Sequence, residues 1–190
     1  MNNKVITIFG AGFIGKSLIF KLLQNGYFIN VVCRNPYLRG YLRSMGNVGQ
    51  LEINYGDIAK TNTIENYFEK SDYIINLVGV LAENSKNKYS KAHVLGPQNI
   101  GLLAKKYNIK RLVHISSIGA DKRSNIKYQK TKGEGEIAIK ENYKDVNIIR
   151  PSIVFGPDDG FFNVQAKLLK SSPITPLFGG GKNKFQPIYV

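Results

Sequence analysis

Three glycines with the spacing G-x-G-x-x-G follow directly on a short apolar run near the start of the chain. The run is Val5–Phe9, and the glycines are Gly10, Gly12 and Gly15. An apolar run of this length without polar alternation is typical of a strand that is covered on both faces. Residues 13–24 then carry apolar side chains at helical spacing. This segment therefore predicts a strand, a tight turn and a helix, in that order.

There is a separate physical reason for a glycine at each of the three positions of this loop. Gly10 permits the tight turn, Gly12 lets the backbone approach a pyrophosphate, and Gly15 lets the helix pack closely on the strand. The helix that begins with Phe13 and Ile14 presents free N–H groups and a positive dipole end at the same place. A purely structural turn is the alternative. We predict that a dinucleotide binds at Gly10, Gly12, Phe13, Ile14 and Gly15.

The alternation of apolar runs and helical patterns continues through most of the chain. We predict further strands at 28–33, 51–54, 73–78, 112–115 and 146–149, and helices at 62–68, 94–107 and 128–141. Asn62 and Glu65 have the spacing of a capping box for the first of these helices. Repeated strand-helix units predict a doubly wound parallel sheet in a three-layer α/β/α arrangement, the Rossmann fold.

The pattern changes after Pro151. Gly156-Pro157 and Gly179-Gly180-Gly181 interrupt short apolar pieces, with a helix expected at 162–170 and a strand within 185–190. We predict a nucleotide-binding domain at residues 1–155 and, at 156–190, the beginning of a small cap that is incomplete.

Composition narrows the class of protein. The chain has 190 residues, which suits one α/β domain, and no apolar run approaches the length of about 18 residues that a membrane span requires. With one cysteine and two histidines, we expect no disulfide and no metal site. We interpret His93 and His114 as structural. Because no targeting pattern opens the sequence, we expect the protein in the cytoplasm.

The chain is strongly basic, with 27 Lys and Arg against 13 Asp and Glu and a formal net charge of +14. Nine basic residues and the single acid Asp121 lie between residues 105 and 132; the nine are Lys105, Lys106, Lys110, Arg111, Lys122, Arg123, Lys127, Lys130 and Lys132. This segment is either a solvated edge or a docking face for an acidic partner or an anionic lipid surface. Nucleic acid is not an expected partner, because no aromatic platform accompanies the charge.

The end of the second predicted strand bears on the choice of dinucleotide. A carboxylate there would bind the ribose 2′-OH of NAD(H), but the first acidic residue of the chain is Glu52. Arg34 ends the strand instead, and its planar guanidinium suits a 2′-phosphate and the adenine face. We therefore favour NADP(H), with NAD(H) as the alternative. Asp57, after the third strand, is expected either to bind the adenine amino group or to form a turn.

Three residues suggest chemistry at the other half of the dinucleotide. Tyr128 and Lys132 form Y-x-x-x-K at the start of the helix after the fifth strand, and Ser117 ends that strand. At helical spacing, the ammonium would lower the pKa of the phenol and bind the nicotinamide ribose. Ser117 would hold a substrate carbonyl while Tyr128 transfers the proton. Asn76 and Gly79 end the fourth strand, where they would meet the dinucleotide, although Asn76 could equally satisfy backbone groups.

In combination, these motifs resemble the extended or atypical branch of the short-chain dehydrogenase/reductase superfamily. The glycine loop, Ser117, Tyr128, Lys132 and the R-P-S-I-V-F-G-P segment at 150–157 follow in the family's order. Segments 75–79, 112–116 and 186–190 look most like the NADPH-binding accessory subunits of respiratory complex I and their bacterial relatives. The resemblance adds Pro151 to the expected cofactor contacts and Asn99 as a residue that bonds across to the sheet.

The resemblance implies tightly bound NADPH in a structural or regulatory role. The expected partner is a protein complex at the periphery of a membrane, so the expected place is the inner face of that membrane. The alternative is an active NAD(P)-dependent oxidoreductase or epimerase that acts on a carbonyl or hydroxyl substrate, such as a nucleotide sugar, through Ser117, Tyr128 and Lys132. Family members continue past the position that matches Val190, so we expect the substrate pocket to be incomplete in this chain.

Overall fold

The structure, a computed structural model, describes residues 4–85, 87–171, 178–182 and 184–190. The chain divides into two compact units, and the division falls between Arg150 and Pro151. Each unit is described by itself below. Within the described residues, no helix is both long enough and apolar enough to cross a membrane.

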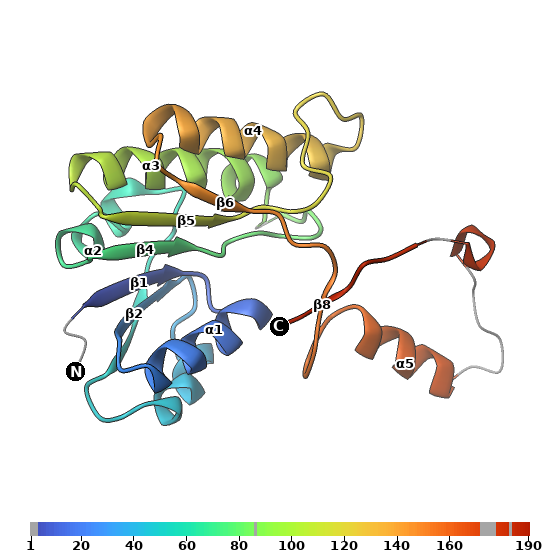
Figure 1. Cartoon of the computed structure of the whole chain (residues 1–190), viewed down its shortest axis with the longest axis horizontal. Coiled ribbons are helices and arrows are strands. Elements are labelled where there is room, and N and C mark those ends of the chain that lie inside the picture. The colour runs from blue at the N-terminus through green and yellow to red at the C-terminus, as the bar shows by residue number, and fades with distance from the viewer. Residues whose placement is uncertain (1–3, 86, 172–177, 183) are drawn as a thin grey trace. The chain divides into compact units, whose positions relative to one another are not determined.

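The first unit is built on a parallel sheet. Among the described residues its strands are β1 (Val5–Phe9), β2 (Phe28–Cys33), β3 (Leu51–Tyr55), β4 (Tyr73–Asn76), β5 (Arg111–Ile115) and β6 (Asn147–Ile149). They are ordered β3-β2-β1-β4-β5-β6, and every neighbouring pair is parallel (Figure 1). This order confirms the predicted doubly wound sheet. It reverses between β1 and β4, and open α/β sheets bind ligands at such a switch point, at the carboxyl ends of the strands.

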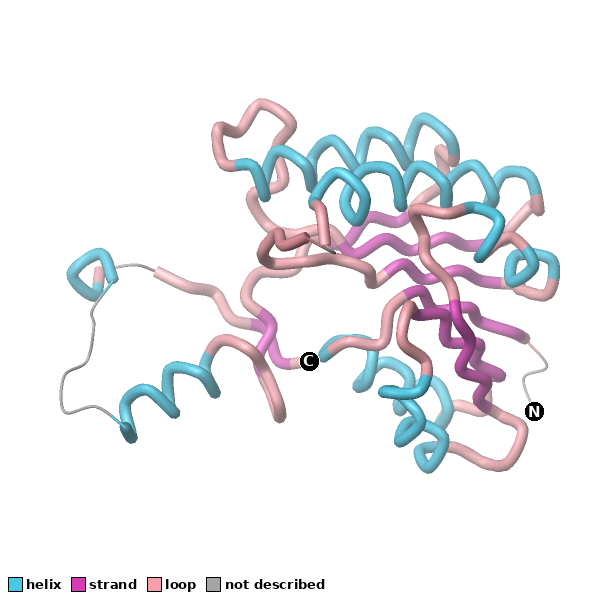
Figure 2. The backbone as a smooth tube through the Cα atoms, turned by 180° about the vertical axis from the view of Figure 1, so that it is seen from behind, coloured by secondary structure: helices cyan, strands magenta, loops and turns pink. Residues whose placement is uncertain are grey.

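Helices cover both faces of this sheet. The helices are α1 (Phe13–Gln24), α2 (Asn66–Glu69), α3 (Gly96–Lys106) and α4 (Lys127–Asn142), with 3₁₀ turns at Tyr37–Met45 and Thr61–Thr63 and a π-helix at Ser90–Leu95. Figures 1 and 2 show α3 and α4 on one side of the strands and α1 on the other. The three-layer Rossmann arrangement is therefore confirmed for this unit.

Successive residues of the strands feed two hydrophobic cores. Phe9 of β1 points into a cluster with Ile100 of α3 and Ile139 of α4. Its neighbour Ile8 points the opposite way, into a cluster with Ile19 of α1. Because side chains alternate along a strand, apolar residues at consecutive positions are required where both faces are covered. This explains why the predicted strands lack polar alternation.

The segment after β3 differs from the prediction. The capping box expected from Asn62 and Glu65 is wrong, because residues 61–63 form a 3₁₀ turn and α2 begins at Asn66 without a side-chain cap. Glu65 accepts hydrogen bonds from the Lys106 ammonium and the Tyr107 hydroxyl instead. These partners lie at the end of α3, far away in the sequence, so local spacing could not reveal them.

Two other element boundaries also differ. The fourth strand ends at Asn76 rather than at residue 78. The helix predicted at 94–107 begins earlier, as the π-helix Ser90–Leu95, and continues as α3. The π-helix adds a residue to the turn, which the 3.6-residue period used in the prediction does not represent.

The second unit is small. Strands β7 (Val154–Phe155) and β8 (Ile188–Tyr189) form a parallel pair, and α5 spans Phe162–Ser171. The Asp159 carboxylate accepts hydrogen bonds from the backbone N–H groups of Phe161 and Phe162, which fixes the start of α5. The strand expected within 185–190 is confirmed at residues 188–189.

Candidate functional site

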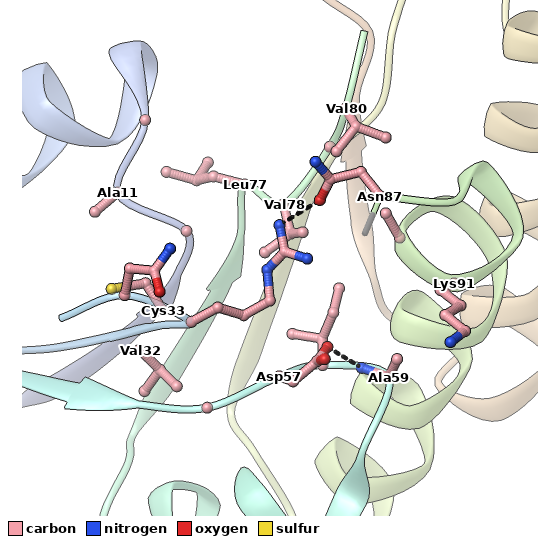
Figure 3. A pocket seen from close by; sticks show the side chains of 18 of the residues that line it. Ala11, Val32, Cys33, Asp57, Ala59, Leu77, Val78, Val80, Asn87 and Lys91 are labelled. Carbon is pink, nitrogen blue, oxygen red and sulfur yellow. Dashed lines mark hydrogen bonds between the residues drawn. The ribbon is translucent and has the colours of Figure 1, made fainter. Parts of the chain in front are cut away.

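A pocket of about 410 Å³ lies at the carboxyl edge of the sheet, where the strand order reverses (Figure 3). Its lining comes from the segments that follow β1, β2, β3 and β4 and from the π-helix. The lining includes Gly10, Gly12, Arg34, Arg39, Asp57, Lys60, Val78, Gly79, Val80, Asn87, Lys88 and Lys91. Residues that are distant in the sequence therefore line one pocket within the first unit.

The glycine loop has the geometry expected of it. Gly10 has φ +98°, a conformation that side chains disfavour, and its N–H donates to the Val32 carbonyl at 3.0 Å. A Cβ on Gly15 would lie 2.7 Å from the Gly10 carbonyl oxygen, so α1 packs directly on the turn. A Cβ on Gly12 would meet nothing within 4 Å. Gly12 is therefore the position where backbone faces open pocket.

Phe13 and Ile14 follow as the first two residues of α1. Both are half-buried, and neither side chain belongs to the pocket lining. A contribution from these residues would come through their backbone N–H groups, which lie in the first turn of the helix and have no intrahelical acceptor.

The charged residues that line the pocket are mostly basic. Arg34 is exposed at the end of β2, and its guanidinium donates to the Asn87 side-chain oxygen at 2.7 Å (Figure 3). Four further basic residues line the pocket as the structure describes it: Arg39, Lys60, Lys88 and Lys91. Asp57 is the one acidic residue in that lining. The site is thus strongly electropositive at the end where Arg34 lies.

Asp57 forms the turn that the sequence offered as one of its two roles. Its carboxylate accepts from the Ala59 N–H at 3.0 Å, and its own N–H donates to the Thr63 hydroxyl at 3.0 Å. These bonds shape the loop after β3 and hold the half-buried carboxylate at the pocket wall. Binding of an adenine amino group by Asp57 stays a prediction.

Of the two residues expected to meet the dinucleotide after the fourth strand, Gly79 lines the pocket and Asn76 does not. Asn76 is fully buried; its side-chain oxygen accepts the Val78 N–H at 3.1 Å, so its NH₂ group faces Nδ1 of His114 at 3.0 Å. The amide is engaged within the protein, and the residue is absent from the pocket lining. Gly79 does line the pocket, and a Cβ there would lie 3.9 Å from both the Lys132 ammonium and Nε2 of His93.

Lys132 is buried inside the first unit. It is 4% exposed, and its ammonium donates to the Ile115 carbonyl at 2.9 Å. Burial lowers the pKa of Lys132 to about 8, although the nearby Glu136 carboxylate acts in the opposite direction. Lys132 thus lies against the end of the strand that precedes Ser117.

Ser117 and Tyr128 flank this lysine. Among the described residues, no group hydrogen-bonds the buried hydroxyl of Ser117. Tyr128 is half-buried one helical turn before Lys132, with its ring edge-on to His93 at 5.5 Å and to Tyr89 at 5.9 Å between centroids. A buried hydroxyl without a partner is costly in a fold and is common where a ligand supplies the missing bond.

An ion pair between the buried Glu136 carboxylate and the exposed Arg150 guanidinium adjoins the lysine, and no sequence motif predicted it. The Arg150 guanidinium donates two hydrogen bonds to the carboxylate of Glu136, which is 6% exposed. Burial would raise the pKa of Glu136, but its hydrogen bonds and the Arg150 charge hold that pKa below the ordinary value. Glu136 and Arg150 are separated by a loop and a strand, so no local pattern links them.

The two histidines are buried and uncharged. Burial lowers the pKa of His114 to about 3 and that of His93 to about 4, and the Lys132 charge adds to both effects. Asn99, also buried, donates to the Ile58 carbonyl at 2.9 Å. Within the described residues, no three His, Cys, Asp or Glu side chains are grouped to hold a metal.

The basic segment 105–132 does not form one surface patch. Lys105–Arg111 precedes or begins β5 and Lys122–Lys130 follows it, so the strand separates the two groups. Lys106 pairs with Glu65, Lys110 with Asp72 and Lys127 with Glu83. The density in sequence is therefore divided between two ends of the sheet, and several charges are neutralised locally.

Comparison with known proteins adds the family. A model of the NAD dependent epimerase/dehydratase family matches residues 6–190. The chain is 32% identical over 190 residues to the NADH dehydrogenase (ubiquinone) 1 alpha subcomplex subunit 9, mitochondrial, of Rattus norvegicus, covering 98% of this chain and 50% of that protein. It is 27% identical over 185 residues to the NADH-ubiquinone oxidoreductase 40 kDa subunit, mitochondrial, of Neurospora crassa, covering 97% and 48%.

A solved structure with a similar fold is the UDP-glucuronic acid 4-epimerase from Bacillus cereus, in complex with UDP-glucuronic acid and NAD. Its TM-score is 0.77 at 21% identity, over 97% of this chain and 69% of that one. At this identity the similarity supports the fold. The chain spans about half the length of the curated relatives that it matches.

Proposed function

Because the chain belongs to the NAD dependent epimerase/dehydratase family, we propose that its first unit binds NADP(H), in preference to NAD(H), in the pocket at the carboxyl edge of the sheet. Family membership supports a nicotinamide dinucleotide as the class of ligand. The preference for the 2′-phosphorylated form is our inference from the charges that line the pocket.

The residues present fit this ligand. At Gly12 the backbone faces open space, which leaves room for a pyrophosphate against the start of α1. Arg34 and Arg39 bring positive charge to the segment after β2, where the adenosine ribose lies in this type of fold, and the lysines at 60, 88 and 91 line the same pocket from the segments after β3 and β4. The observation that carries the proposal is Arg34 in the place where NAD(H)-binding sites have a carboxylate, with four further cations lining the same pocket.

The other half of the ligand would lie toward Gly79 and Lys132. The Lys132 ammonium would hold the nicotinamide ribose hydroxyls, and Tyr128, one turn earlier on α4, would contact the same ribose. Asn76 and the backbone of Phe13 and Ile14 remain proposed contacts within the first unit. When bound, a nicotinamide dinucleotide supplies hydride chemistry, whereas these side chains bind, orient and protonate.

For the whole protein we propose an accessory role in a respiratory complex. The two curated relatives described above are named as subunits of NADH-ubiquinone oxidoreductase and NADH dehydrogenase, and the chain aligns with them over nearly all of its length. In this role the bound NADP(H) stabilises the fold and is not consumed. We propose that this complex lies at the periphery of a membrane.

Turnover is the second candidate function, and one observation favours it. Ser117 keeps a buried hydroxyl without a hydrogen-bond partner in the described structure, next to the strand end that Lys132 contacts. In an enzyme, this hydroxyl would bind a substrate carbonyl and Tyr128 would donate the proton. An enzyme must exchange its nucleotide, so chasing bound NADPH with excess NADP⁺ separates the candidates. Retention through gel filtration favours the accessory role, and rapid exchange favours turnover.

The nucleotide preference is tested by calorimetric titration with 2′,5′-ADP and 5′-ADP. We expect the chain to bind 2′,5′-ADP at least about tenfold more tightly, since charge-assisted hydrogen bonds to a phosphate contribute about 1.5–3 kcal/mol. Arg34→Gln should remove most of that difference. Arg43→Gln is the control, because Arg43 is exposed and lies outside the pocket lining. Equal affinity of the unaltered chain for the two nucleotides would contradict the proposal.

A further inference from the structure

His93 occupies a junction between three parts of the first unit. It lies in the π-helix Ser90–Leu95 and is 2% exposed. Its Nε2 accepts the Val80 N–H at 3.1 Å, and its Nδ1 lies 3.0 Å from the Thr131 hydroxyl of α4. One imidazole therefore joins the segment after β4 to the helix that carries Tyr128 and Lys132.

The hydrogen bonds fix the protonation state of this ring. A backbone N–H only donates, so Nε2 is the acceptor and the proton of the neutral ring lies on Nδ1. From there it is donated to the Thr131 hydroxyl, whose one hydrogen is shared between the carbonyls of Lys127 and Tyr128. Burial and the neighbouring Lys132 charge lower the pKa of His93 to about 4, so the ring stays neutral at physiological pH.

Aromatic packing holds the ring in one orientation. The Tyr89 ring stacks on His93, with 5.0 Å between centroids and an interplanar angle of 16°. The Tyr128 ring meets His93 edge-on at 89°. The Tyr89 hydroxyl donates to the Leu81 carbonyl, one residue beyond Val80. His93 and Tyr89 thus fix two successive residues of the same segment.

The backbone packing around His93 is unusually close. A Cβ on Gly135 of α4 would lie 1.7 Å from the His93 carbonyl oxygen, so only glycine permits the π-helix to approach α4 this closely. π-Helical turns are rare and recur at functional sites. In this chain, Lys91 of the π-helix and Lys88, two residues before it, line the pocket, whereas His93 of the same π-helix is buried behind the lining.

The tethered segment, residues 78–80, runs along the pocket wall from the glycine loop to Lys132. Val78 passes the glycine loop so closely that a Cβ on Gly10 would lie 3.2 Å from its nitrogen. Gly79 lies near both His93 and the Lys132 ammonium, and Val80 is bound by His93 itself. Figure 3 shows Val78 and Val80 following one another along this wall. A shift of this segment would change the space beside Lys132.

We propose that His93 is a positioning residue for the nicotinamide half of the site: it holds the backbone at Gly79 and Val80 against α4, beside Lys132. The inference rests on the proposed NADP(H) site. It assigns no contact between His93 and the nucleotide. At the other end of the pocket the Arg34 guanidinium is held by Asn87, whereas the two hydrogen bonds of the His93 ring go to Val80 and Thr131, so we expect that end to change little when His93 is replaced.

Two substitutions separate the two hydrogen bonds of the imidazole. An Asn amide reaches as far as Nδ1, so His93→Asn retains the donor to Thr131 and loses the acceptor for Val80. A Gln amide reaches as far as Nε2, so His93→Gln retains the acceptor for Val80. Both substitutions remove the stacked ring, so the difference between them reports on the Val80 tether.

The measurement is the dissociation constant of NADPH and of 2′,5′-ADP for the full chain and the two variants. We expect His93→Asn to weaken NADPH about 5- to 20-fold, the range for loss of one buried hydrogen bond, with 2′,5′-ADP unchanged within about twofold. His93→Gln should restore NADPH affinity to within about threefold of the unaltered chain. The fluorescence of the bound reduced nicotinamide should change in the Asn variant and not in the Gln variant.

Three results would overturn the inference: unchanged NADPH affinity in His93→Asn, an equal loss for both ligands, or no recovery in His93→Gln. Should His93→Asn fail to fold, His93→Leu also removes the acceptor for the Val80 N–H, and the same selective loss of NADPH affinity is expected relative to His93→Gln. Failure of the unaltered chain to bind NADPH at all would instead refute the proposed function, so the two failures are distinguishable.

Discussion

Replacing Gly12 and Gly15 separately by alanine tests whether the glycine loop serves the fold or the ligand. Gly12 has φ −82° and ψ −157°, an extended conformation that alanine adopts, and a Cβ there would meet nothing within 4 Å. We therefore expect Gly12→Ala to fold normally, at a cost of about 0.5–1 kcal/mol because glycine is the better N-cap residue. Its new methyl group would face the proposed pyrophosphate and should weaken NADPH binding by tenfold or more.

Gly15→Ala should have the opposite result. Its Cβ would lie 2.7 Å from the Gly10 carbonyl oxygen, which is backbone and cannot move aside without opening the turn. Overpacking of this kind costs about 1–3 kcal/mol, and the better helix propensity of alanine returns up to about 1 kcal/mol. A net loss of about 1–2 kcal/mol lowers the melting temperature of a chain of this size by roughly 2–8 °C.

Chemical denaturation and NADPH titration of both variants provide the comparison. The expected result is a stable, weakly binding Gly12→Ala variant and a destabilised Gly15→Ala variant. The reasoning is refuted if Gly12→Ala binds NADPH like the unaltered chain, or if Gly15→Ala is as stable as the unaltered chain.

Three further predictions concern the residues around Lys132. Burial lowers the pKa of Lys132 in the folded chain to about 8 from an ordinary value of 10.5, so between these two pH values the unfolded chain binds one more proton than the folded chain. The free energy of unfolding should therefore rise from pH 8 to pH 10.5. Chemical denaturation at pH 7.5 and at pH 10 should show a smaller rise in this free energy for Lys132→Met than for the unaltered chain. Glu136→Gln should destabilise the fold by about 1–2 kcal/mol above pH 4.5, and the difference should shrink as the pH falls through the lowered pKa of Glu136, with exposed Glu141→Gln as the control; no loss in urea denaturation at pH 7 would argue against the ion pair with Arg150. Ser117→Ala removes a hydroxyl without a hydrogen-bond partner in the described structure, so the melting temperature should stay within about 2 °C; a larger fall would mean that this hydroxyl has a structural bond.

The sequence was most informative where structure depends on neighbouring residues. The strand, glycine turn and helix at residues 5–24 follow from local periodicity and from the freedom of glycine, and the structure has β1 and α1 at those bounds. The parallel direction of the strands follows from the repeated strand-helix pattern along the sequence. Arg34 could be assigned to the pocket because the end of β2 has a fixed place beside the glycine loop in such a sheet.

Contacts between distant segments could not be predicted in this way. Lys88 and Lys91 line the pocket just before and within a π-helix, and no 3.6-residue pattern predicts that element. Arg150 pairs with Glu136, but the end of α4, a loop and β6 separate the two residues in the sequence, so no local pattern shows that they meet. The basic segment 105–132 shows the converse case. Its basic residues are close in the sequence, but β5 separates them into two groups, so they do not form one surface patch.

The most direct test of the proposed function is the melting temperature of the full chain with NADPH, with NADH and with neither, after its absorbance in the reduced nicotinamide band has been checked. Ligand at 100 times its dissociation constant stabilises by about 2.7 kcal/mol, which corresponds to roughly 5–11 °C for a chain of this size. We predict that increase with NADPH and a much smaller one with NADH at the same concentration. Equal increases, or no increase in a folded chain that carries no nucleotide, would contradict the proposed NADP(H) site.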